Sequence, residues 1–457
     1  MRFHLFRNAL RSKESPSTLE GEPIRNYTHF LETPLKIVGC WDWYRFPQKD
    51  REIIINNLYL CIVLFVLINV PTTLYVHLYI EWVDVMSSLD TLADSLPFAV
   101  SIIIVVYFAL FRRELYELSD FMLEKFKYRS ACGLTNMTML NSYRKAKNFG
   151  YFYTACTMFS VTMYCVPEII NWWTGQPLQS PQYMDITQSP YFEFTFLRQC
   201  LSQAFVGLAM GQFGVFFAAN AIILCGQLDL LCCSLRNTRY TALLRCGVRH
   251  RAVAAAHRDI QGDELHNYIY NVAEMKESNY HYDQKMNPVY GDRRSHFDVY
   301  SSEFDAATYD ALRDCARVCD AVNRYKNKFE SFVSPLLALR VVQVTLYLCV
   351  LLYAATLKFD MVTVEYLAAV ALDIFVYCFY GNQIIIQAER VSLAAYQSAW
   401  HTAGARPRRL LLHILLAHRR PVAVRAGYFL PMDLHTFLII IKTSFSYYTL
   451  LVNVNEK

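Results

Sequence analysis

Apolar residues gather along the chain in seven long runs that few charges interrupt. A helix that crosses a bilayer needs about 20 predominantly apolar residues, and these runs are of comparable length. In chain order they are Ile53–Ile80, a run that begins in the acidic stretch near Asp84 and ends at Phe111, Asn148–Pro167, Gln199–Leu228, Ser331–Leu357, Tyr366–Gln387 and Leu434–Val454. The pattern predicts an all-α, polytopic membrane protein with seven transmembrane helices.

The long segment between the fourth and fifth runs has two helical edges and an irregular middle. Leu228, Leu231, Cys232 and Leu235 prolong the fourth helix, and apolar residues at steps of three and four lead into the fifth. The latter are Leu312, Cys315, Cys319, Val322 and Phe329. Each edge therefore carries one apolar stripe that needs a partner. The middle, about 247–302, mixes charges with tyrosines without a helical period, so we expect a poorly ordered insertion there.

Composition agrees with a membrane protein. The 457 residues are 54% hydrophobic, 15% aromatic and only 18% charged, which is more apolar and less charged than an average soluble domain. The first twenty residues lack the apolar core of a signal peptide. We therefore expect the first helix itself to direct membrane insertion.

The positive charges fall almost entirely on one side of the predicted spans. Lys and Arg number nine before the first helix, eight in 112–147, fifteen in 229–330 and six in 389–420, whereas the alternate loops and the C-terminal tail hold three. Cytoplasmic loops accumulate Lys and Arg. The bias of 38 to three predicts a cytoplasmic N-terminus and places Lys457 outside.

Motifs of catalysis and cofactor binding are missing from the sequence. It contains no HExxH, GxSxG, Walker or GxGxxG motif. Its cysteines form no CxxC pair, and Cys315 and Cys319 have no histidine close by in sequence to complete a zinc site. We expect no enzyme activity, no cofactor and no metal.

Three ionisable residues lie inside the predicted spans, where such groups mark functional sites by default. Arg340 lies near the inner end of the fifth span, so we expect its side chain to reach water by snorkelling. Asp373, in the middle of the sixth, must be protonated, paired or next to water. Lys442, in the last, is either hydrated by an inner vestibule or paired with a carboxylate such as Asp433.

The last span carries polar residues on one face. The 21 residues from Asp433 to Asn453 extend about 31 Å as a helix. Ser446, Thr449 and Asn453 share a face that Leu450 and Val454 border. Two interpretations are open: the hydroxyls bond back to their own helix, or several copies of the stripe surround water, which requires an oligomer.

The C-terminal third resembles the insect odorant receptors, with a lepidopteran character. The resemblance rests on the runs YCFYGNQIIIQAERVSLAAYQSAW, LLLHILLAHRRPVAVRAG and DLHTFLIIIKTSFSYYTLL. The matching positions are Tyr377-Cys378, Gly381-Asn382, Ala395-Tyr396, Trp400, Pro421, Ala426-Gly427, Phe437, Lys442-Thr443, Ser446-Tyr447 and Thr449-Leu450-Leu451. Asp433 and Phe445 depart from the commoner Ser and Tyr, and Asp433 remains a good N-cap.

The resemblance implies an odorant-gated, non-selective cation channel that assembles as a heterotetramer with the family's coreceptor subunit. It implies a multi-pass plasma-membrane protein of sensory dendrites, embedded in the lipid bilayer and binding a small volatile ligand, with no nucleic-acid partner. It also implies an intracellular anchor domain built from the inner ends of helices four to six and the first half of helix seven, and Pro431 fits the start of the second half.

The expected organisation is therefore as follows: a cytoplasmic segment 1–52, spans one to four in 53–228, a cytoplasmic loop 229–330, spans five and six in 331–388, an anchor segment 389–430, and the pore-lining helix with an outer tail in 431–457.

The resemblance also implies site residues. Leu450 and Val454 fall at the positions of a hydrophobic gate, with Lys442, Ser446, Thr449 and Asn453 along the pore. The ligand pocket would lie among helices two, three, four and six in the outer half of the bundle. Its candidate residues are Leu89, Leu92, Leu96, Thr157, Val161, Tyr164, Phe205, Leu208, Thr363 and Tyr366.

Two other receptor classes share parts of this pattern. A gustatory-receptor-type ligand-gated channel shares the last-helix signature loosely and stays open as an alternative. A G-protein-coupled receptor also has seven helices, but it needs an external N-terminus, which the charge bias opposes.

Overall fold

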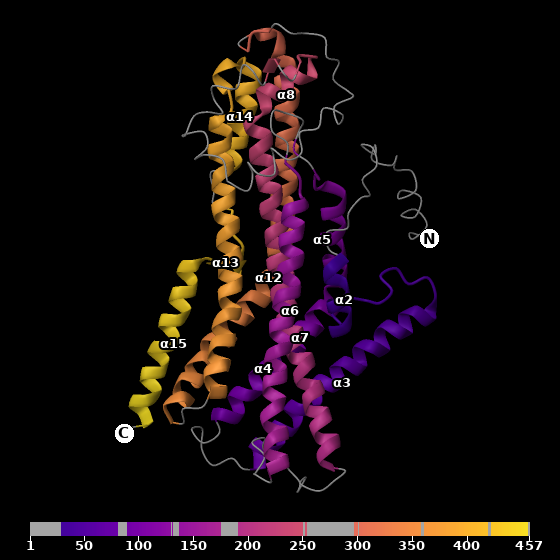
Figure 1. Cartoon of the computed structure of the whole chain (residues 1–457), viewed down its shortest axis with the longest axis vertical. Helices are drawn as coiled ribbons and strands as arrows, with labels where there is room; N and C mark the ends of the chain where they lie inside the picture. The colour runs from indigo at the N-terminus through magenta and orange to yellow at the C-terminus, as the bar shows by residue number, and fades with distance from the viewer. Residues whose placement is uncertain are drawn as a thin grey trace.

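The computed structural model describes residues 29–80, 89–128, 130, 137–174, 191–249, 252–253, 297–299, 301–357, 361–418 and 422–455. Its described part is almost entirely helical. Seven helices of 22 residues or more form an elongated bundle (Figure 1). They are α3 (Asp50–Ile80), α4 (Leu89–Leu110), α6 (Leu140–Thr174), α7 (Tyr191–Arg236), α12 (Asp305–Leu357), α13 (Met361–Gln397) and α15 (Leu434–Asn455). The predicted all-α fold is confirmed, and six of the seven predicted runs lie within these helices. The second run begins at residues outside the described part, and from Leu89 it is α4, with Phe111 directly after the helix.

By length and composition, four of the described helices are apolar enough to cross a membrane: α3, α7, α12 and α13. A fifth span arises if α4 and α5 (Arg112–Lys125), bent by 68° to each other, count together. Within the described residues α6 and α15 do not meet this criterion, and basic residues at the start of α6 lower its hydropathy.

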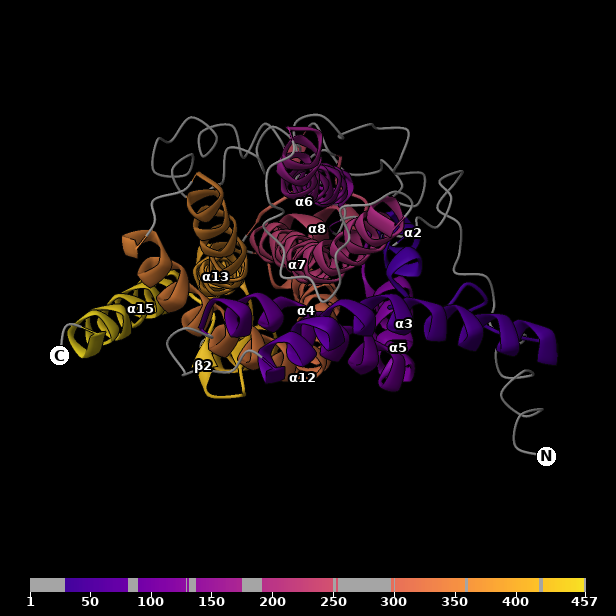
Figure 2. The same ribbon diagram turned by 90° about the horizontal axis from the view of Figure 1, so that it is seen from below.

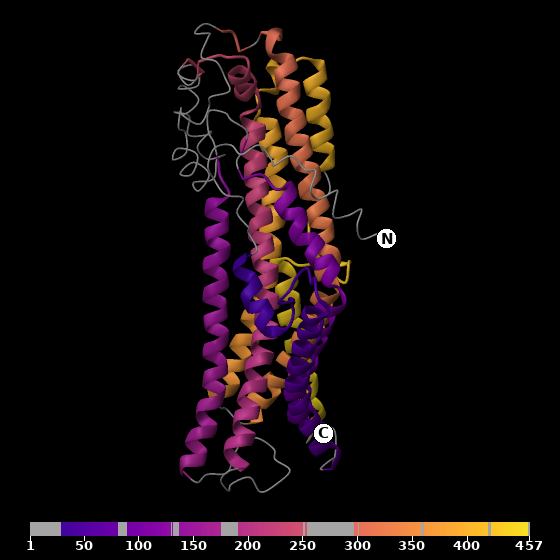
Figure 3. The same cartoon turned by 90° about the vertical axis from the view of Figure 1, so that its right-hand side faces the viewer.

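Aromatic side chains fill the places where α4, α7 and α12 cross. The Phe108 ring lies 5.7 Å from Phe216 and 5.2 Å from Phe332, both edge-on, an arrangement that aromatic quadrupoles favour. Tyr107 donates a hydrogen bond of 2.9 Å to the carbonyl oxygen of Phe332. These contacts fix α12, which runs from the tip of the molecule into the bundle (Figure 3).

The ends of α7, α12 and α13 pack with α8 (Thr238–Arg245) and α14 (Ala405–Ala417) at one tip of the molecule (Figure 1). The apolar stripes predicted on the two helical edges are buried there, and Leu231, Leu235 and Leu312 are at most 3% exposed. Where such side chains leave water, each stabilises the fold by about 1.5–3 kcal/mol. The stripes therefore have the partner that the sequence requires.

A buried arginine connects the two chain segments that flank the insertion. The middle of the insertion, at 254–296, lies outside the described residues. Arg239 of α8 is 1% exposed and donates to the carbonyl oxygens of Val299 and Ser301 at 2.7 Å. It also donates to Thr308 at 2.8 Å, and its ion pair with Asp305 measures 3.3 Å. These contacts join the two edges of the insertion at the start of α12.

A short hairpin separates α14 from α15. Its strands are β1 (Arg425–Ala426) and β2 (Leu430–Pro431), and they pair antiparallel. The expectation that Pro431 begins the last helix is therefore wrong, because Pro431 lies in β2 opposite Arg425. The helix begins at Leu434, and the Asp433 carboxylate accepts the Thr436 N–H at 2.7 Å. Asp433 is the N-cap that its residue type allows.

Candidate functional site

One face of α15 packs on the bundle and the opposite face is open. Thr436, Ile440 and Ser444 follow at four-residue steps and are at most 4% exposed. On the other side, Leu438 is 54% and Leu450 is 59% exposed. The open face also carries Lys442, Phe445, Ser446 and Thr449. Among the described residues, the main contacts of α15 are with α12 and α13, and Figure 2 shows the helix reaching away from the rest of the bundle.

The hydroxyls of α15 divide between these two faces. Ser444 is 1% exposed and donates to the carbonyl of Ile440 at 2.9 Å, with the Thr345 carbonyl of α12 at 3.3 Å. Thr449 lies on the open face and bonds back to the Ser446 carbonyl at 2.8 Å. Back-bonding to the helix therefore occurs, and it leaves Ser446 and Thr449 exposed. The side chains of Asn453 and Val454 lie outside the described part of the structure.

Lys442 is exposed and stands apart from Asp433. The Asp433 carboxylate caps the helix nine residues before Lys442. The predicted ion pair between Lys442 and Asp433 is therefore wrong. Within the described residues no carboxylate lies within 4.0 Å of the Lys442 ammonium group. Hydration of Lys442 stays a prediction.

A buried ion pair joins the two helices that carry α15. The Arg340 guanidinium of α12 contacts the Asp373 carboxylate of α13, and the two residues are 3% and 8% exposed. Tyr153 of α6 donates to the same carboxylate at 2.9 Å, and Gln343 accepts from Arg340. Of the three states open to Asp373, the structure has the paired one. The expectation that Arg340 snorkels to water is wrong, because the carboxylate opposite makes burial tolerable.

The residues around this pair leave polar atoms without partners. Within the described residues, the hydroxyl of Tyr377 and the Nε of Arg340 have no hydrogen-bond partner. Tyr377 is 0% exposed and lies one helical turn from Asp373. Sequence reasoning missed Tyr153, Gln343 and Tyr377. Spacing could have found the last two, at i+3 from Arg340 and i+4 from Asp373, whereas Tyr153 comes from a distant helix and has no local signal.

The N-terminal end of α15 packs tightly against α13. Gly381 faces the residue before the helix cap so closely that a Cβ there would lie 2.1 Å from the carbonyl oxygen of Met432. Six residues before Gly381 on α13, the ring of Phe375 meets that of Phe437 edge-on at 5.5 Å. The base of α15 is therefore held against α13 by close packing.

The residues predicted to line a ligand pocket are only partly described. The side chains of Leu89, Leu92, Tyr164 and Thr363 lie outside the described part. Thr157 and Val161 of α6 contact α7 where Gly207 and Gly211 allow close approach, and Phe205 and Leu208 pack on the main core. Leu96 is partly buried on α4, and Tyr366 packs beside Tyr347 and Leu351. The α6 and α7 candidates thus lie together, and ligand contact by any of the ten stays a prediction.

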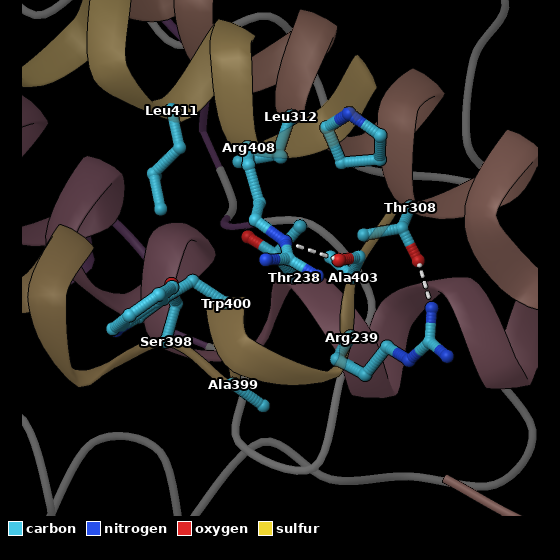
Figure 4. Close-up of a pocket in the computed structure, with 11 residues that line it drawn as sticks. Thr238, Arg239, Thr308, Leu312, Ser398, Ala399, Trp400, Ala403, Arg408 and Leu411 are labelled. Atoms are coloured by element: carbon cyan, nitrogen blue, oxygen red, sulfur yellow. Dashed lines mark hydrogen bonds between the residues drawn. The ribbon is translucent and has the colours of Figure 1, made fainter. Parts of the chain in front are cut away.

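A separate hollow lies at the tip of the molecule, away from α15 (Figure 4). It is lined by Thr238, Arg239, Thr308, Leu312, Ser398, Ala399, Trp400, Ala403, Pro407, Arg408 and Leu411. Both arginines already serve the fold, since Arg239 donates to Thr308 at 2.8 Å and Arg408 to the Ala403 carbonyl at 2.6 Å. Its polar groups hold the tip together, so the candidate functional site is α15 with its ion-paired supports.

Comparison with known proteins gives one consistent result. The family profile described as 7tm Odorant receptor matches residues 87–445. The chain is 23% identical to odorant receptor 83a of Drosophila melanogaster over 343 residues, 73% of each chain. It is also 23% identical to putative odorant receptor 85e of the same species over 361 residues, 77% of this chain and 74% of that one.

The fold has a counterpart among solved structures. The olfactory receptor OR5 of Machilis hrabei, determined in complex with eugenol, superposes with a TM-score of 0.67 at 15% identity. The superposition covers 94% of this chain and 100% of that one.

Proposed function

The chain belongs to the 7tm odorant receptor family, and from this premise we propose that it is a subunit of an odorant-gated, non-selective cation channel. The observation that carries the proposal is the family match over residues 87–445, which includes Arg340, Asp373 and Lys442 and ends at Phe445 within α15. OR5 of Machilis hrabei binds eugenol, a small ligand. A small volatile, mostly apolar molecule is accordingly the class of ligand proposed here.

The open face of α15 supports its role as the pore helix. One helix cannot enclose water, but copies arranged around a symmetry axis can. In that arrangement Ser446, Thr449 and Asn453 face water, and Lys442 meets the inner vestibule. Leu450 and Val454 form a ring that stays dry and closed until it widens and becomes hydrated.

The supports of α15 suggest how a ligand opens the pore. The proposed pocket lies between α4, α6, α7 and α13 in the outer half of the bundle, and α6 and α13 also supply Tyr153 and Asp373 of the buried network. A ligand that binds the open arrangement more tightly shifts the population toward it, by no more than that difference in affinity. The shift reaches α15 through α13, at the Phe375–Phe437 and Gly381–Met432 contacts.

The cellular setting is proposed from the charge bias and the family. The N-terminus and the tip formed by α8 and α14 lie in the cytoplasm as an anchor, and Lys457 lies outside. The assembly is a heterotetramer with the family's coreceptor subunit in the plasma membrane of a sensory dendrite. The helices α7, α12 and α13 run without a break through the domain boundaries predicted from the sequence. In this proposal the boundaries mark where each helix leaves the membrane.

Recording odour-evoked current tests the proposal. The chain is expressed alone, with the coreceptor, and the coreceptor alone, and a panel of volatile compounds is applied. We expect cation current only when both subunits are present, for at least one compound that leaves the coreceptor alone silent. Surface-expressed receptor that stays silent to the whole panel would count against the channel. An epitope at Lys457 that is accessible only after permeabilisation would overturn the orientation.

A further inference from the structure

Three aromatic side chains are exposed on the segment between α2 (His29–Val38) and α3. Trp43, Tyr44 and Phe46 are 44%, 43% and 72% exposed. The backbone beneath them is held firmly, because Tyr44 exchanges two hydrogen bonds with Asn56 of α3, at 3.2 and 3.0 Å. The exposure of these rings is thus a fixed feature of the fold.

The other side of the segment is fastened to α5. Asp42 accepts hydrogen bonds from Arg112 and, at 2.9 Å, from the Tyr116 hydroxyl. Arg45 donates to Asp120 at 2.7 Å and lies over the rings of Tyr116 and Phe46, 4.9 and 5.2 Å from their centroids. The polar side chains face the protein. Trp43 packs edge-on against Tyr59 of α3 at 5.7 Å and keeps 44% of its surface exposed, and Phe46 is the most exposed of the three rings.

The helix that follows shows what surrounds these rings. The apolar part of α3 is only 22% buried, against 89% in α7, and Ile53, Ile54 and Ile55 are 45–62% exposed. A spanning helix exposed to this extent faces lipid. Phe46 precedes Ile53 by seven residues, which places it beside the end of the hydrocarbon layer. Figure 2 shows α3 and α15 on opposite flanks of the molecule, so this surface lies away from the proposed pore.

We propose that Trp43, Tyr44 and Phe46 form an aromatic anchor that inserts into the headgroup and glycerol region of the inner leaflet. Tyr and Trp are favoured at this depth because their rings are apolar and their tips are polar. The anchor fixes the entry of α3 and, through Asp42 and Arg45, the position of α5. It rests on α3 spanning the membrane and does not depend on odorant gating.

Photocrosslinking in the full-length receptor, expressed with the coreceptor, tests the anchor. Benzoylphenylalanine replaces Phe46, Phe65 or Leu412 one at a time. Phe46 and Phe65 are matched at 72% and 69% exposure, with Phe65 within α3, and Leu412 of α14 is 54% exposed. After irradiation of the membranes, mass spectrometry identifies what is attached to each position.

We expect phospholipid adducts at positions 46 and 65 and none at position 412. The adduct at 46 should lie near the glycerol and the adduct at 65 along the acyl chain. Lipid at 65 without lipid at 46, or a crosslink from 46 to another protein chain, overturns the anchor. Because the readout is attached lipid, it holds whether or not the same receptor conducts an odour-evoked current.

Discussion

Arg340 of α12 and Asp373 of α13 form an ion pair that is almost completely withdrawn from solvent, and Tyr153 of α6 donates a third contact to the carboxylate. Removing one member of such a pair leaves an uncompensated buried charge, whereas removing both does not. The pair therefore ties three helices together at the level where α12 and α13 support α15.

Breaking this pair should destabilise the receptor strongly. We expect Arg340→Met or Asp373→Leu alone to cost about 3–5 kcal/mol, and the double variant to recover much of that loss. Melting of the detergent-solubilised assembly and its surface expression measure the effect. The exposed pair Arg324–Asp320, at 67% and 55% side-chain exposure, is the matched control and should contribute about 0–1 kcal/mol. A double variant as unstable as the worse single one would contradict the pairing.

The two faces of α15 should differ in their access to water. Ser446→Cys and Thr449→Cys should react with a charged thiol reagent during odour stimulation and block the current, because both positions lie on the open face. Ser444→Cys should not react, since Ser444 is 1% exposed against α12. Equal modification at 444 and 446 would mean that α15 is rotated from the orientation seen here.

Shortening the gate side chain should raise the resting current. Leu450→Ala removes apolar volume from the proposed constriction, so we expect a several-fold increase in current without odorant, or altered ion selectivity. Leu346→Ala on α12 is the control, because Leu346 is 49% and Leu450 59% exposed. Unchanged resting current and selectivity in Leu450→Ala would show that Leu450 does not form the gate.

Adding a methyl group at Gly381 should displace the base of α15. A Cβ there would lie 2.1 Å from a backbone oxygen, which cannot rotate away, so we expect Gly381→Ala to cost about 1–3 kcal/mol or more. Gly214→Ala is the control, because its nearest neighbours would be 3.5 Å away. Melting temperature and odour-evoked current report the two effects. Equal tolerance of both variants would argue against a tight α13–α15 joint.

Acid should weaken the tip through His418. Burial lowers the pKa of His418 from its ordinary value of 6.5, and the ring lies 3.5 Å from the Cys319 sulfur. Because the folded state holds the ring neutral, its contribution is complete above about pH 6.5 and is lost as the pH falls. We expect His418→Gln to reduce the drop in melting temperature between pH 7.5 and 5.5.

His413, exposed on α14, whose C-cap is His418, supplies the control for this measurement. His413→Gln should keep the full pH dependence of the unmodified receptor. The same drop in all three proteins would exclude His418 as its source.

The sequence alone determined the long helices and the side of the membrane proposed for each loop. Apolar runs such as Ile53–Ile80 are local, and a bilayer demands them whatever the neighbouring helices do. The burial of the stripes at Leu231 and Leu312 was predictable for the same reason. A period of three to four residues can be recognised within a single segment of sequence. Family membership was also readable, since its signature lies within consecutive residues of the last third.

Only the tertiary structure decided which polar groups meet. The sequence left Asp373 protonated, paired or next to water, and which of these applies depends on the rotation of α12 and α13 about their axes. That rotation is set by packing with every neighbouring helix, including α6, which brings Tyr153 from 220 positions away. Likewise, the helical period places Ser444 and Ser446 on different faces of α15, and the packing with α12 decides that the face of Ser444 is the buried one.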